Sequence, residues 1–343
     1  MHKPGVILVN IGSPASPAVA DVRRFLGEFL MDGRVIDLPF LVRLFLVRCL
    51  ILPIRAPKTA AAYARIWTAE GSPLVATSTR LKTALQQQLG FTVELAMRYG
   101  TPSIPSAVAK LASGGVTDLL LVPLFPHYAM STYETAVVAV REVVTRCVPG
   151  ARLTVLPPFY ARTEYINALT TVARENSTQT AEHVLLSFHS LPERHLRKTD
   201  PTGTHCLART DCCAVPSPAH ATCYKHQCLI TAEAFVKACG LAPQKYSITF
   251  QSQFGPGRWL GPPTVGELRR LAGAGIKKIA VVCPSFVTDC IETIEEIGIG
   301  ARAEFMSAGG SEFTLVPCLN DHPVWVKALA TMIKQMLEHN SGA

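Results

Sequence analysis

The stretch LASGGVTDLLLVPLF at residues 111–125 and its counterpart LAGAGIKKIAVVCPSF at residues 271–286 decide the fold. Each reads as the end of a helix, a glycine stop, a short buried strand and a loop that contains proline and phenylalanine. The two segments match with a one-residue gap and begin 160 positions apart. Although α/β units of one type also look alike, a repeat at this distance predicts two similar α/β domains that face each other across a cleft.

Apolar runs that alternate with helical patterns extend this prediction to the rest of the chain. The runs are rich in Val, Ile and Leu, and they lie at residues 5–12, 118–125, 153–157, 183–190, 246–254 and 278–286. Helical patterns occupy residues 21–31, 106–113, 133–146 and 264–275. This alternation is typical of parallel sheets that helices cover on both faces. We therefore expect an α/β fold of two Rossmann-like domains, at residues 1–150 and 151–343, with a final helix at 323–338 that packs back on the first domain.

The bulk composition describes a folded protein that meets anionic partners. The 343 residues are 48% hydrophobic and 17% charged, and their formal net charge is +8. The basic residues are scattered among long apolar segments, which favours acidic small molecules or anionic membrane surfaces over nucleic acid. The N-terminus lacks the pattern of a signal peptide, so we expect a cytoplasmic protein with reduced cysteines, possible contact with the inner membrane, and no nucleic-acid partner. Oligomeric state does not follow from these features.

The apolar stretch PFLVRLFLVRCLILPIR at residues 39–55 bears on membranes. Arg43 and Arg48 interrupt it, and it is shorter than the roughly 20 apolar residues that a spanning helix needs. One interpretation is a buried helix whose arginines extend to water. The other is a lip that touches a bilayer or a greasy substrate, as a peripheral membrane contact.

The first strand ends in Asn10-Ile-Gly-Ser-Pro14 and lacks the glycine spacing that cradles a pyrophosphate, so nucleotide use is unsupported. In open parallel sheets, ligands sit beyond the carboxyl ends of the strands. His189 is delivered by such a strand end. After the strand at residues 279–283, Asp289, Glu292 and Glu296 fall at i, i+3 and i+7 of an expected helix over residues 288–297, with Glu295 beside them. Taken singly, a strand-end histidine and an acidic helix start have structural explanations. Together they indicate proton and divalent-metal handling.

These residues resemble the ferrochelatases, the enzymes that insert Fe²⁺ into a porphyrin to make heme. The resemblance rests on Ser187-Phe-His-Ser-Leu-Pro192 and on residues 282–297. Further ordered matches cover nearly the whole chain, at residues 8–14, 63–74, 97–100, 122–128 and 250–254. The family implies two chelatase-type domains with the porphyrin between them, and Fe²⁺ and protoporphyrin IX as substrates. One departure is Cys290, where many relatives have a histidine.

The resemblance also implies roles for single residues. His189 matches the active-site histidine, the expected proton acceptor or first Fe²⁺ ligand, and Glu292 matches its partner carboxylate, the other expected Fe²⁺ ligand. Asp289, Glu295 and Glu296 would form a relay for protons or metal. The porphyrin pocket would be lined by Ile11, Arg98, Tyr99 and Phe286. Two alternatives to protoporphyrin ferrochelatase are a heme- or porphyrin-binding carrier or iron–sulfur sensor without turnover, and a cobalt or nickel chelatase for a more acidic tetrapyrrole. Preference for protoporphyrin over coproporphyrin does not follow from the sequence.

Five of the eleven cysteines fall within residues 204–228, THCLARTDCCAVPSPAHATCYKHQC. Zinc sites usually use C-x2-4-C pairs, which this stretch lacks apart from the adjacent Cys212 and Cys213. Irregular spacing suits a [2Fe–2S] cluster at least as well, with zinc and no metal as alternatives. Some ferrochelatases bind such a cluster with C-terminal cysteines, which are absent after Cys318, and a bacterial subset resembles this chain in having an internal cysteine-rich insert. The expected ligands are Cys206, Cys213, Cys223 and Cys228, with Cys212 as the alternative to Cys213.

Overall fold

The computed structural model describes residues 4–176 and 178–341. The chain divides into two compact units, and each is described by itself. The first unit comprises Met1–Leu124, Met130–Pro157 and Asp321–Ala343, and the second comprises Phe125–Ala129 and Pro158–Asn320. Both units are therefore discontinuous along the chain. The expected domain boundary between residues 150 and 151 stays a prediction.

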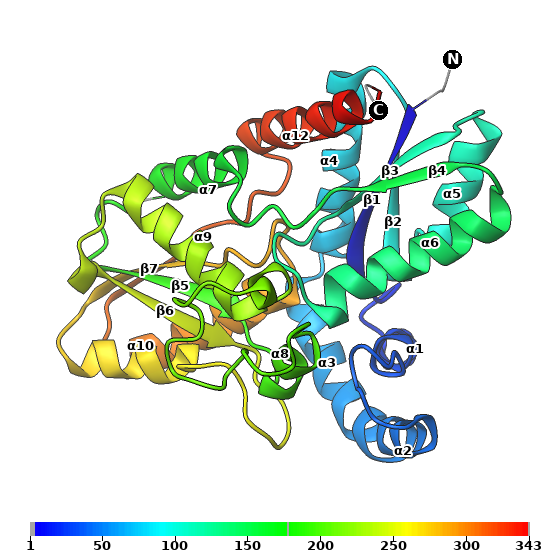
Figure 1. Ribbon diagram of the computed structural model, residues 1–343. Helices are drawn as coiled ribbons and strands as arrows, with labels where there is room; N and C mark the ends of the chain where they lie inside the picture. Colours follow the sequence, from blue (N-terminus) through cyan, green and yellow to red (C-terminus); the bar gives the residue numbers. More distant parts are fainter. Residues whose placement is uncertain (1–3, 177, 342–343) are drawn as a thin grey trace. The chain divides into compact units, whose positions relative to one another are not determined.

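The first unit is built on a four-stranded parallel sheet in the order β2–β1–β3–β4 (Figure 1). Its strands are β1 (Pro4–Ser13), β2 (Val93–Gly100), β3 (Asp118–Pro123) and β4 (Arg152–Val155). Its helices are α1 (Val19–Leu30), α2 (Phe40–Phe45), η1 (Leu46–Ile51), α3 (Leu52–Ile66), α4 (Pro73–Leu89), α5 (Ile104–Ser113), η2 (Met130–Glu134), α6 (Thr135–Cys147) and α12 (Pro323–Ser341). Helices α4, α5 and α6 contact the sheet, and α12 packs against α4.

The second unit repeats this plan with a sheet in the order β6–β5–β7–β8. Its strands are β5 (His183–His189), β6 (Tyr246–Gln251), β7 (Lys278–Val282) and β8 (Glu312–Leu315). Its helices are α7 (Thr163–Glu175), α8 (Glu193–Lys198), η3 (Pro218–Ala221), α9 (Tyr224–Cys239), η4 (Pro243–Lys245), α10 (Thr264–Gly273), η5 (Ile291–Ala301) and α11 (Arg302–Ser307). Helices α9 and α10 contact β6, and α11 contacts β8.

The repeat in the sequence corresponds to the same place in both sheets. The segment 111–125 supplies the end of α5 and then β3, and the segment 271–286 supplies the end of α10 and then β7. Both strands lie third in their sheet, between the strand that comes first in sequence and an edge strand. The predicted α/β fold class, two parallel sheets covered by helices, is confirmed.

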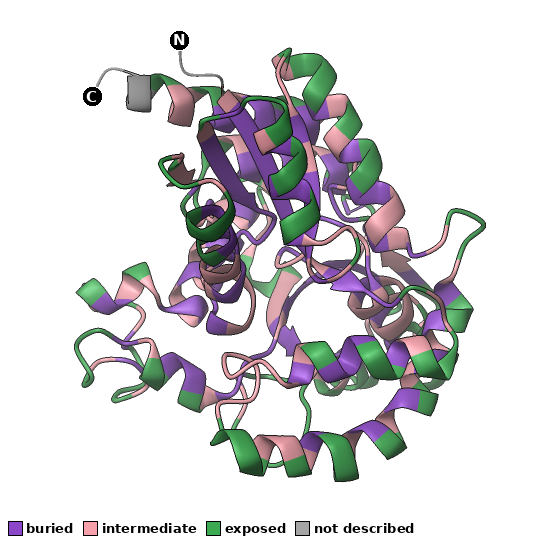
Figure 2. Cartoon of the chain, turned by 90° about the vertical axis from the view of Figure 1, so that its right-hand side faces the viewer, coloured by how far each residue is buried: buried purple, intermediate pink, exposed green. Residues whose placement is uncertain are grey.

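Burial explains why these strands formed where apolar runs were found. Val6 to Val9 of β1 are fully buried, and so are Leu120 to Val122 of β3. In Figure 2 the strands are coloured as buried along most of their length, whereas the surrounding helices alternate buried and exposed residues. The sequence prediction missed β2 and β8, which are edge strands that mix polar residues such as Glu94 and Glu312 into short apolar runs.

Residues 40–66 form one continuous helical run through α2, the π-helix η1 and α3. Pro53 lies in the first turn of α3 and does not end the run. The large exposed apolar side chains of this run are Phe40, Leu41, Val42, Phe45, Leu50 and Ile54, and we call them the apolar patch. The interpretation as a buried helix is therefore wrong for this face. Within the described part of the chain, no helix combines the length and apolar character needed to cross a bilayer.

Candidate active site

His189 is the last residue of β5, at the edge of the second sheet where parallel strands end together. β5 pairs with β6 as far as His189 and Gln251, but its pairing with β7 stops at Leu186 and Val282. The loops that follow β5, β6 and β7 therefore leave the sheet around this histidine. Because ligands of open parallel sheets bind beyond the carboxyl ends of the strands, the position suits a functional side chain.

A backbone contact fixes the protonation pattern of the His189 ring. Nδ1 lies 2.6 Å from the carbonyl oxygen of Ser190. A carbonyl oxygen only accepts hydrogen bonds, so Nδ1 carries the hydrogen and donates it. In the neutral imidazole, Nε2 then keeps a free lone pair, which can accept a proton or bind a metal ion. The ring of Phe286 lies 6.1 Å from the imidazole, so the structure brings these two predicted site residues together.

Glu292, Glu295 and Glu296 lie in a π-helix, so the α-helical stripe assumed from the sequence is wrong in its geometry. η5 begins after Cys290 and runs from Ile291 to Ala301. Its i→i+5 hydrogen bonds widen each turn beyond the 3.6 residues of an α-helix. Glu292 and Glu296 are four residues apart and interact electrostatically, and Glu295 directly precedes Glu296 in the chain.

Asp289 precedes η5 and its carboxylate is engaged in local hydrogen bonds. It accepts them from Asn320 Nδ2 at 2.7 Å, from Thr293 Oγ1 at 2.8 Å and from the backbone N–H of Cys318. These contacts tie the start of η5 to the segment that follows β8. The expected part of Asp289 in a relay stays a prediction, but the structure gives this side chain a clear anchoring contact.

Glu296 is the acidic side chain that the surroundings perturb most clearly. Its carboxylate accepts hydrogen bonds from the backbone N–H of Ser252 at 2.7 Å and from Ser252 Oγ at 2.5 Å. Burial raises the pKa of Glu296, because desolvation outweighs these hydrogen bonds and the charge of His189, which lower it. His189 and Glu292 both interact electrostatically with Glu296. The structure thus gathers the predicted histidine and two of the predicted carboxylates.

Sequence reasoning missed four side chains around this histidine. Gln251 Nε2 donates to the backbone oxygen of Glu292 at 2.7 Å, and Ser252 holds Glu296. Gln251 and Ser252 belong to the motif Phe250–Phe254 at the end of β6, and this motif entered the sequence prediction only as part of the family resemblance. Tyr224 and Ser285 contact the His189 backbone. A serine after a strand and a tyrosine at a helix start carry no sequence signal that would have singled them out.

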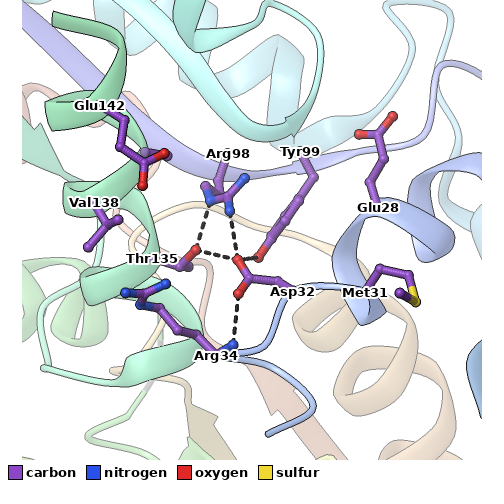
Figure 3. Close-up of a pocket in the computed structure, with 10 residues that line it drawn as sticks. Glu28, Met31, Asp32, Arg34, Arg98, Tyr99, Thr135, Val138 and Glu142 are labelled. Atoms are coloured by element: carbon purple, nitrogen blue, oxygen red, sulfur yellow. Dashed lines mark hydrogen bonds and ion pairs between the residues drawn. The ribbon is translucent and has the colours of Figure 1, made fainter. Parts of the chain in front are cut away.

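The predicted pocket residues Arg98 and Tyr99 lie on β2 of the first unit, where they line a cavity of about 400 Å³ (Figure 3). Arg98 Nη2 and the Tyr99 hydroxyl both donate to Asp32 Oδ2, at 2.6 and 2.9 Å. Thr135 Oγ1 donates to the same oxygen, and its oxygen accepts from Arg98 Nε. Sequence reasoning missed Asp32 and Thr135, although they hold the predicted pair in place.

Asp32 and Arg98 form a partly buried ion pair in this cavity. Burial raises the pKa of Asp32, but hydrogen bonds from Thr135, the Arg34 backbone and Tyr99, with the charge of Arg98, outweigh it and lower that pKa. Asp32 is therefore ionised near neutral pH and neutralises Arg98. Burial is also the main reason that the pKa of Tyr99 is raised, so its hydroxyl keeps its hydrogen.

Ile11, the remaining predicted pocket residue, lies near the carboxyl end of β1 and is partly exposed. Its neighbour Gly12 is paired with Tyr99 and has a φ of 108°. A Cβ on Gly12 would lie 1.8 Å from the Tyr99 carbonyl oxygen, so only glycine fits there. This close approach brings the end of β1, and Ile11 with it, beside the Arg98–Tyr99 pair.

The cysteine-rich stretch 204–228 packs its thiols together in the second unit. Cys206, Cys212, Cys223 and Cys228 are buried, and Cys213 is half-buried. Hydrogen bonds join the Cys223 thiol to those of Cys213 and Cys206. The bond from Cys213 is the main reason that the pKa of Cys223 is lowered to about 6, whereas burial raises the pKa of Cys206 to about 12.

The backbone of this stretch is held by one carboxylate. Asp200 accepts hydrogen bonds from the backbone N–H groups of His205 and Cys206, both at 2.8 Å. In residues 4–176 and 178–341, no group of three or more His, Cys, Asp or Glu side chains is arranged as a metal site. The donor chemistry nevertheless fits iron, because thiols that share a buried place are the ligands of iron–sulfur clusters.

Comparison with known proteins assigns the chain to a family. The sequence model of the family described as ferrochelatase matches residues 3–337.

The chain belongs to the ferrochelatase family.

Curated relatives agree over nearly the full length. A ferrochelatase of Azotobacter vinelandii is 51% identical over 331 residues, covering 96% of this chain and 98% of the relative. One of Pseudomonas fluorescens is 51% identical and covers 96% and 97%. One of Opitutus terrae is 47% identical and covers 98% and 99%. Membership makes the chain a metal chelatase, a lyase of heme biosynthesis that inserts iron into protoporphyrin, so an enzyme is favoured over a carrier without turnover.

Solved structures support the fold. SirB from Bacillus subtilis with Fe³⁺ has a TM-score of 0.55 at 12% identity and covers 99% of this chain and 98% of that one. The sirohydrochlorin chelatase SirB from Bacillus subtilis subspecies spizizenii, in complex with cobalt, has a TM-score of 0.55 at 10% identity and covers 99% and 97%. At such identities the likeness concerns the chelatase fold alone.

Proposed function

We propose that the iron insertion of this family is carried out here with His189 as the proton acceptor or first Fe²⁺ ligand, and with Glu292 as its partner carboxylate. The observation that carries this proposal is the ring geometry of His189. Its Nδ1–H is bound to the Ser190 carbonyl, which leaves the Nε2 lone pair available at the end of β5. A neutral imidazole with a fixed tautomer is suited to take up a proton at neutral pH.

The chemistry requires such a group. A free-base porphyrin loses two pyrrole protons when Fe²⁺ takes their place among the four nitrogens. Those N–H groups are weak acids, so a base held beside them accelerates the exchange. After His189 accepts a proton at Nε2, it passes this proton to the carboxylate of Glu296, whose raised pKa suits reversible protonation. Glu295 and Asp289 extend this relay toward solvent in the proposal.

The porphyrin itself is a large apolar ring with carboxylates at one side. Ile11 and Phe286 are partly exposed apolar side chains, which suit contact with the face of the ring. Tyr99 and Arg98 are held by Asp32, and their fixed orientation favours binding without further loss of side-chain freedom. A rigid apolar surface is also able to bend the flat ring and expose its nitrogen lone pairs, using binding energy from the rest of the macrocycle.

The substrate is tested by comparing three tetrapyrroles without oxygen. The protein is mixed with Fe²⁺ and protoporphyrin IX, Fe²⁺ and coproporphyrin III, or Co²⁺ and sirohydrochlorin, and metal insertion is followed by absorbance. We expect kcat/KM to be highest for protoporphyrin IX, because the apolar patch and pocket residues favour a dicarboxylate. A higher value for coproporphyrin III would reassign the porphyrin, and a higher value for sirohydrochlorin with cobalt would favour the other chelatase class.

The cysteines of 204–228 would hold a [2Fe–2S] cluster through Cys206, Cys213, Cys223 and Cys228, with Cys212 as the alternative to Cys213. Such a cluster, when bound, supplies a redox-sensitive cross-link between the insert and α9. The hydrogen bonds that join the thiols of Cys206, Cys213 and Cys223 support this choice. The backbone carbonyl oxygens of Cys212 and Cys213 both accept hydrogen bonds from histidines, so these backbone contacts do not distinguish the two cysteines.

The apolar patch supports a peripheral contact with the cytoplasmic face of a membrane. Leu41 is 74% exposed and Phe45 is 61% exposed, and both belong to one short helix. The exposed Arg48 is close along the chain and is complementary to anionic lipid. An apolar helix surface beside a cation is typical of interfacial helices.

Vesicle binding tests this contact. We expect Leu41→Ser combined with Phe45→Ser to weaken co-sedimentation with phosphatidylglycerol vesicles by at least about tenfold, since each buried side chain contributes about 1.5–3 kcal/mol. Met306→Ser, at an exposed apolar residue of α11, is the matched control and should bind as the unaltered protein does. Equal binding of the double variant and the control would contradict the membrane proposal.

A further inference from the structure

The peptide groups of His189 lack a strand partner on the β7 side. Ser190 donates its N–H to Gln251 of β6, so the N–H and C=O of the preceding residue point the other way. On that side, the ladder between β5 and β7 has already ended at Leu186 and Val282. Buried backbone groups without a partner are costly, so other residues have to satisfy them.

Two side chains from separate elements do so. The backbone N–H of His189 donates to Ser285 Oγ at 3.3 Å, and the His189 carbonyl oxygen accepts from the Tyr224 hydroxyl at 2.8 Å. The two hydroxyl oxygens are themselves 2.8 Å apart. Together with the His189 peptide groups they close a ring of three hydrogen bonds.

The direction of each hydrogen bond in this ring is fixed. The His189 carbonyl oxygen only accepts, so the single hydrogen of Tyr224 goes to it. Ser285 must then donate its hydrogen to Tyr224, which leaves its own oxygen free to accept from the His189 N–H. Every donor has one acceptor, and such closed chains of hydrogen bonds strengthen one another in a buried place.

The ring connects the histidine to the cysteine-rich stretch. Tyr224 is the first residue of α9, and Cys223 is the residue that caps this helix. Tyr224 is only 6% exposed, and Cys228, one turn later in α9, is fully buried. The first turn of α9 is therefore hydrogen-bonded directly to the backbone that carries the imidazole.

We propose that Tyr224 and Ser285 are positioning residues for His189, which hold its peptide so that Nε2 points at the reacting nitrogen. The inference rests on the proposed role of His189. Neither hydroxyl needs to touch the porphyrin. Their effect therefore falls on the rate of the chemical step rather than on substrate binding, because a small displacement of a catalytic group costs up to about 100-fold in rate.

Steady-state kinetics of single variants test the proposal. Tyr224→Phe and Ser285→Ala each remove one hydroxyl, and we expect each to lower kcat about tenfold with the KM values for porphyrin and Fe²⁺ unchanged. Ser285→Thr keeps a hydroxyl and should recover most of the rate. The double variant should lose little more than either single variant, because the ring is already open. Far-UV spectra and melting temperatures show that the variants are folded.

Tyr133→Phe is the matched control, since the Tyr133 hydroxyl also donates to a backbone carbonyl, that of Leu156, at 2.9 Å in the first unit. It should leave kcat unchanged. The proposal is overturned if Tyr224→Phe keeps the full kcat, if only KM changes, or if Ser285→Thr is as slow as Ser285→Ala. If His189→Ala is inactive, any of these three outcomes rejects only the positioning role of Tyr224 and Ser285. Full activity of His189→Ala would reject the proposed function as well.

Discussion

We expect His189→Ala to lower the kcat of Fe²⁺ insertion by about 1,000-fold, within the range of about 10²–10⁴ that general bases contribute. Affinity for protoporphyrin IX is expected to stay as it is, because the imidazole contributes a proton acceptor and not the apolar surface of the pocket. The two quantities are measured separately, the rate by anaerobic absorbance and the affinity by quenching of porphyrin fluorescence.

The same strand provides a control for this variant. His183 begins β5, as His189 ends it, and its Nε2 lies 2.9 Å from Ser247 Oγ. Burial lowers the pKa of His183, so this ring is neutral near pH 7. His183→Asn removes a neutral, hydrogen-bonded imidazole from the opposite end of the sheet and should leave kcat within a factor of a few. If both variants kept their activity, His189 would not be the base.

The second large effect concerns the cysteine-rich stretch. Protein purified without oxygen is expected to contain about two iron and two acid-labile sulfide per chain, with the visible absorbance of a [2Fe–2S] cluster. Cys223→Ser should abolish all three signals and lower the melting temperature, because metal binding to a folded site adds to folding stability. Cys223 is chosen because its thiol contacts those of Cys206 and Cys213.

Two controls sharpen this result. Cys147→Ser alters an exposed cysteine outside the stretch and should keep iron and sulfide. Cys212→Ser should keep them as well, whereas Cys213→Ser should lose them, since of these two cysteines Cys213 is the one that shares a hydrogen bond with Cys223. Colourless protein without sulfide would reject the cluster, and loss in Cys212→Ser but not in Cys213→Ser would exchange the two ligands.

The sequence predicted the sheets well because their strands are buried on both faces. Val6–Val9 and Leu120–Val122 have no exposed surface, and a fully buried strand has to be apolar along its whole length. The glycine before each strand and the proline and phenylalanine after it then located β3 and β7 at corresponding positions of the two sheets. β2 and β8 were missed because polar residues such as Glu94 and Glu312 interrupt their apolar runs, whereas the other two edge strands, β4 and β6, were found.

The local helix geometry did not follow from the sequence. The acidic residues were placed with 3.6 residues per turn, but η5 is a π-helix, so Asp289 falls outside it and Glu292 pairs in space with Glu296. Periodicity assumes a helix type and does not test it. In the same way, hydrophobicity over residues 39–55 did not distinguish a buried helix from the exposed apolar patch.

Residues that support the site were hidden for a different reason. Asp32, Tyr224 and Ser285 act through hydrogen bonds to groups that are distant in sequence, with separations of 66, 35 and 96 residues for their contacts to Arg98 and His189. No spacing rule connects such pairs. His189 itself was found because the end of a parallel strand is a position with a known consequence.

Multiple turnover is the measurement that tests the central claim most directly. The protein at low concentration is mixed without oxygen with an excess of Fe²⁺ and protoporphyrin IX, and heme is quantified as its pyridine complex. We predict many moles of heme per mole of chain from the unaltered protein, and a rate near that of the uncatalysed reaction from His189→Ala. Porphyrin binding without heme formation above the protein-free rate would contradict the claim that this chain is an iron chelatase.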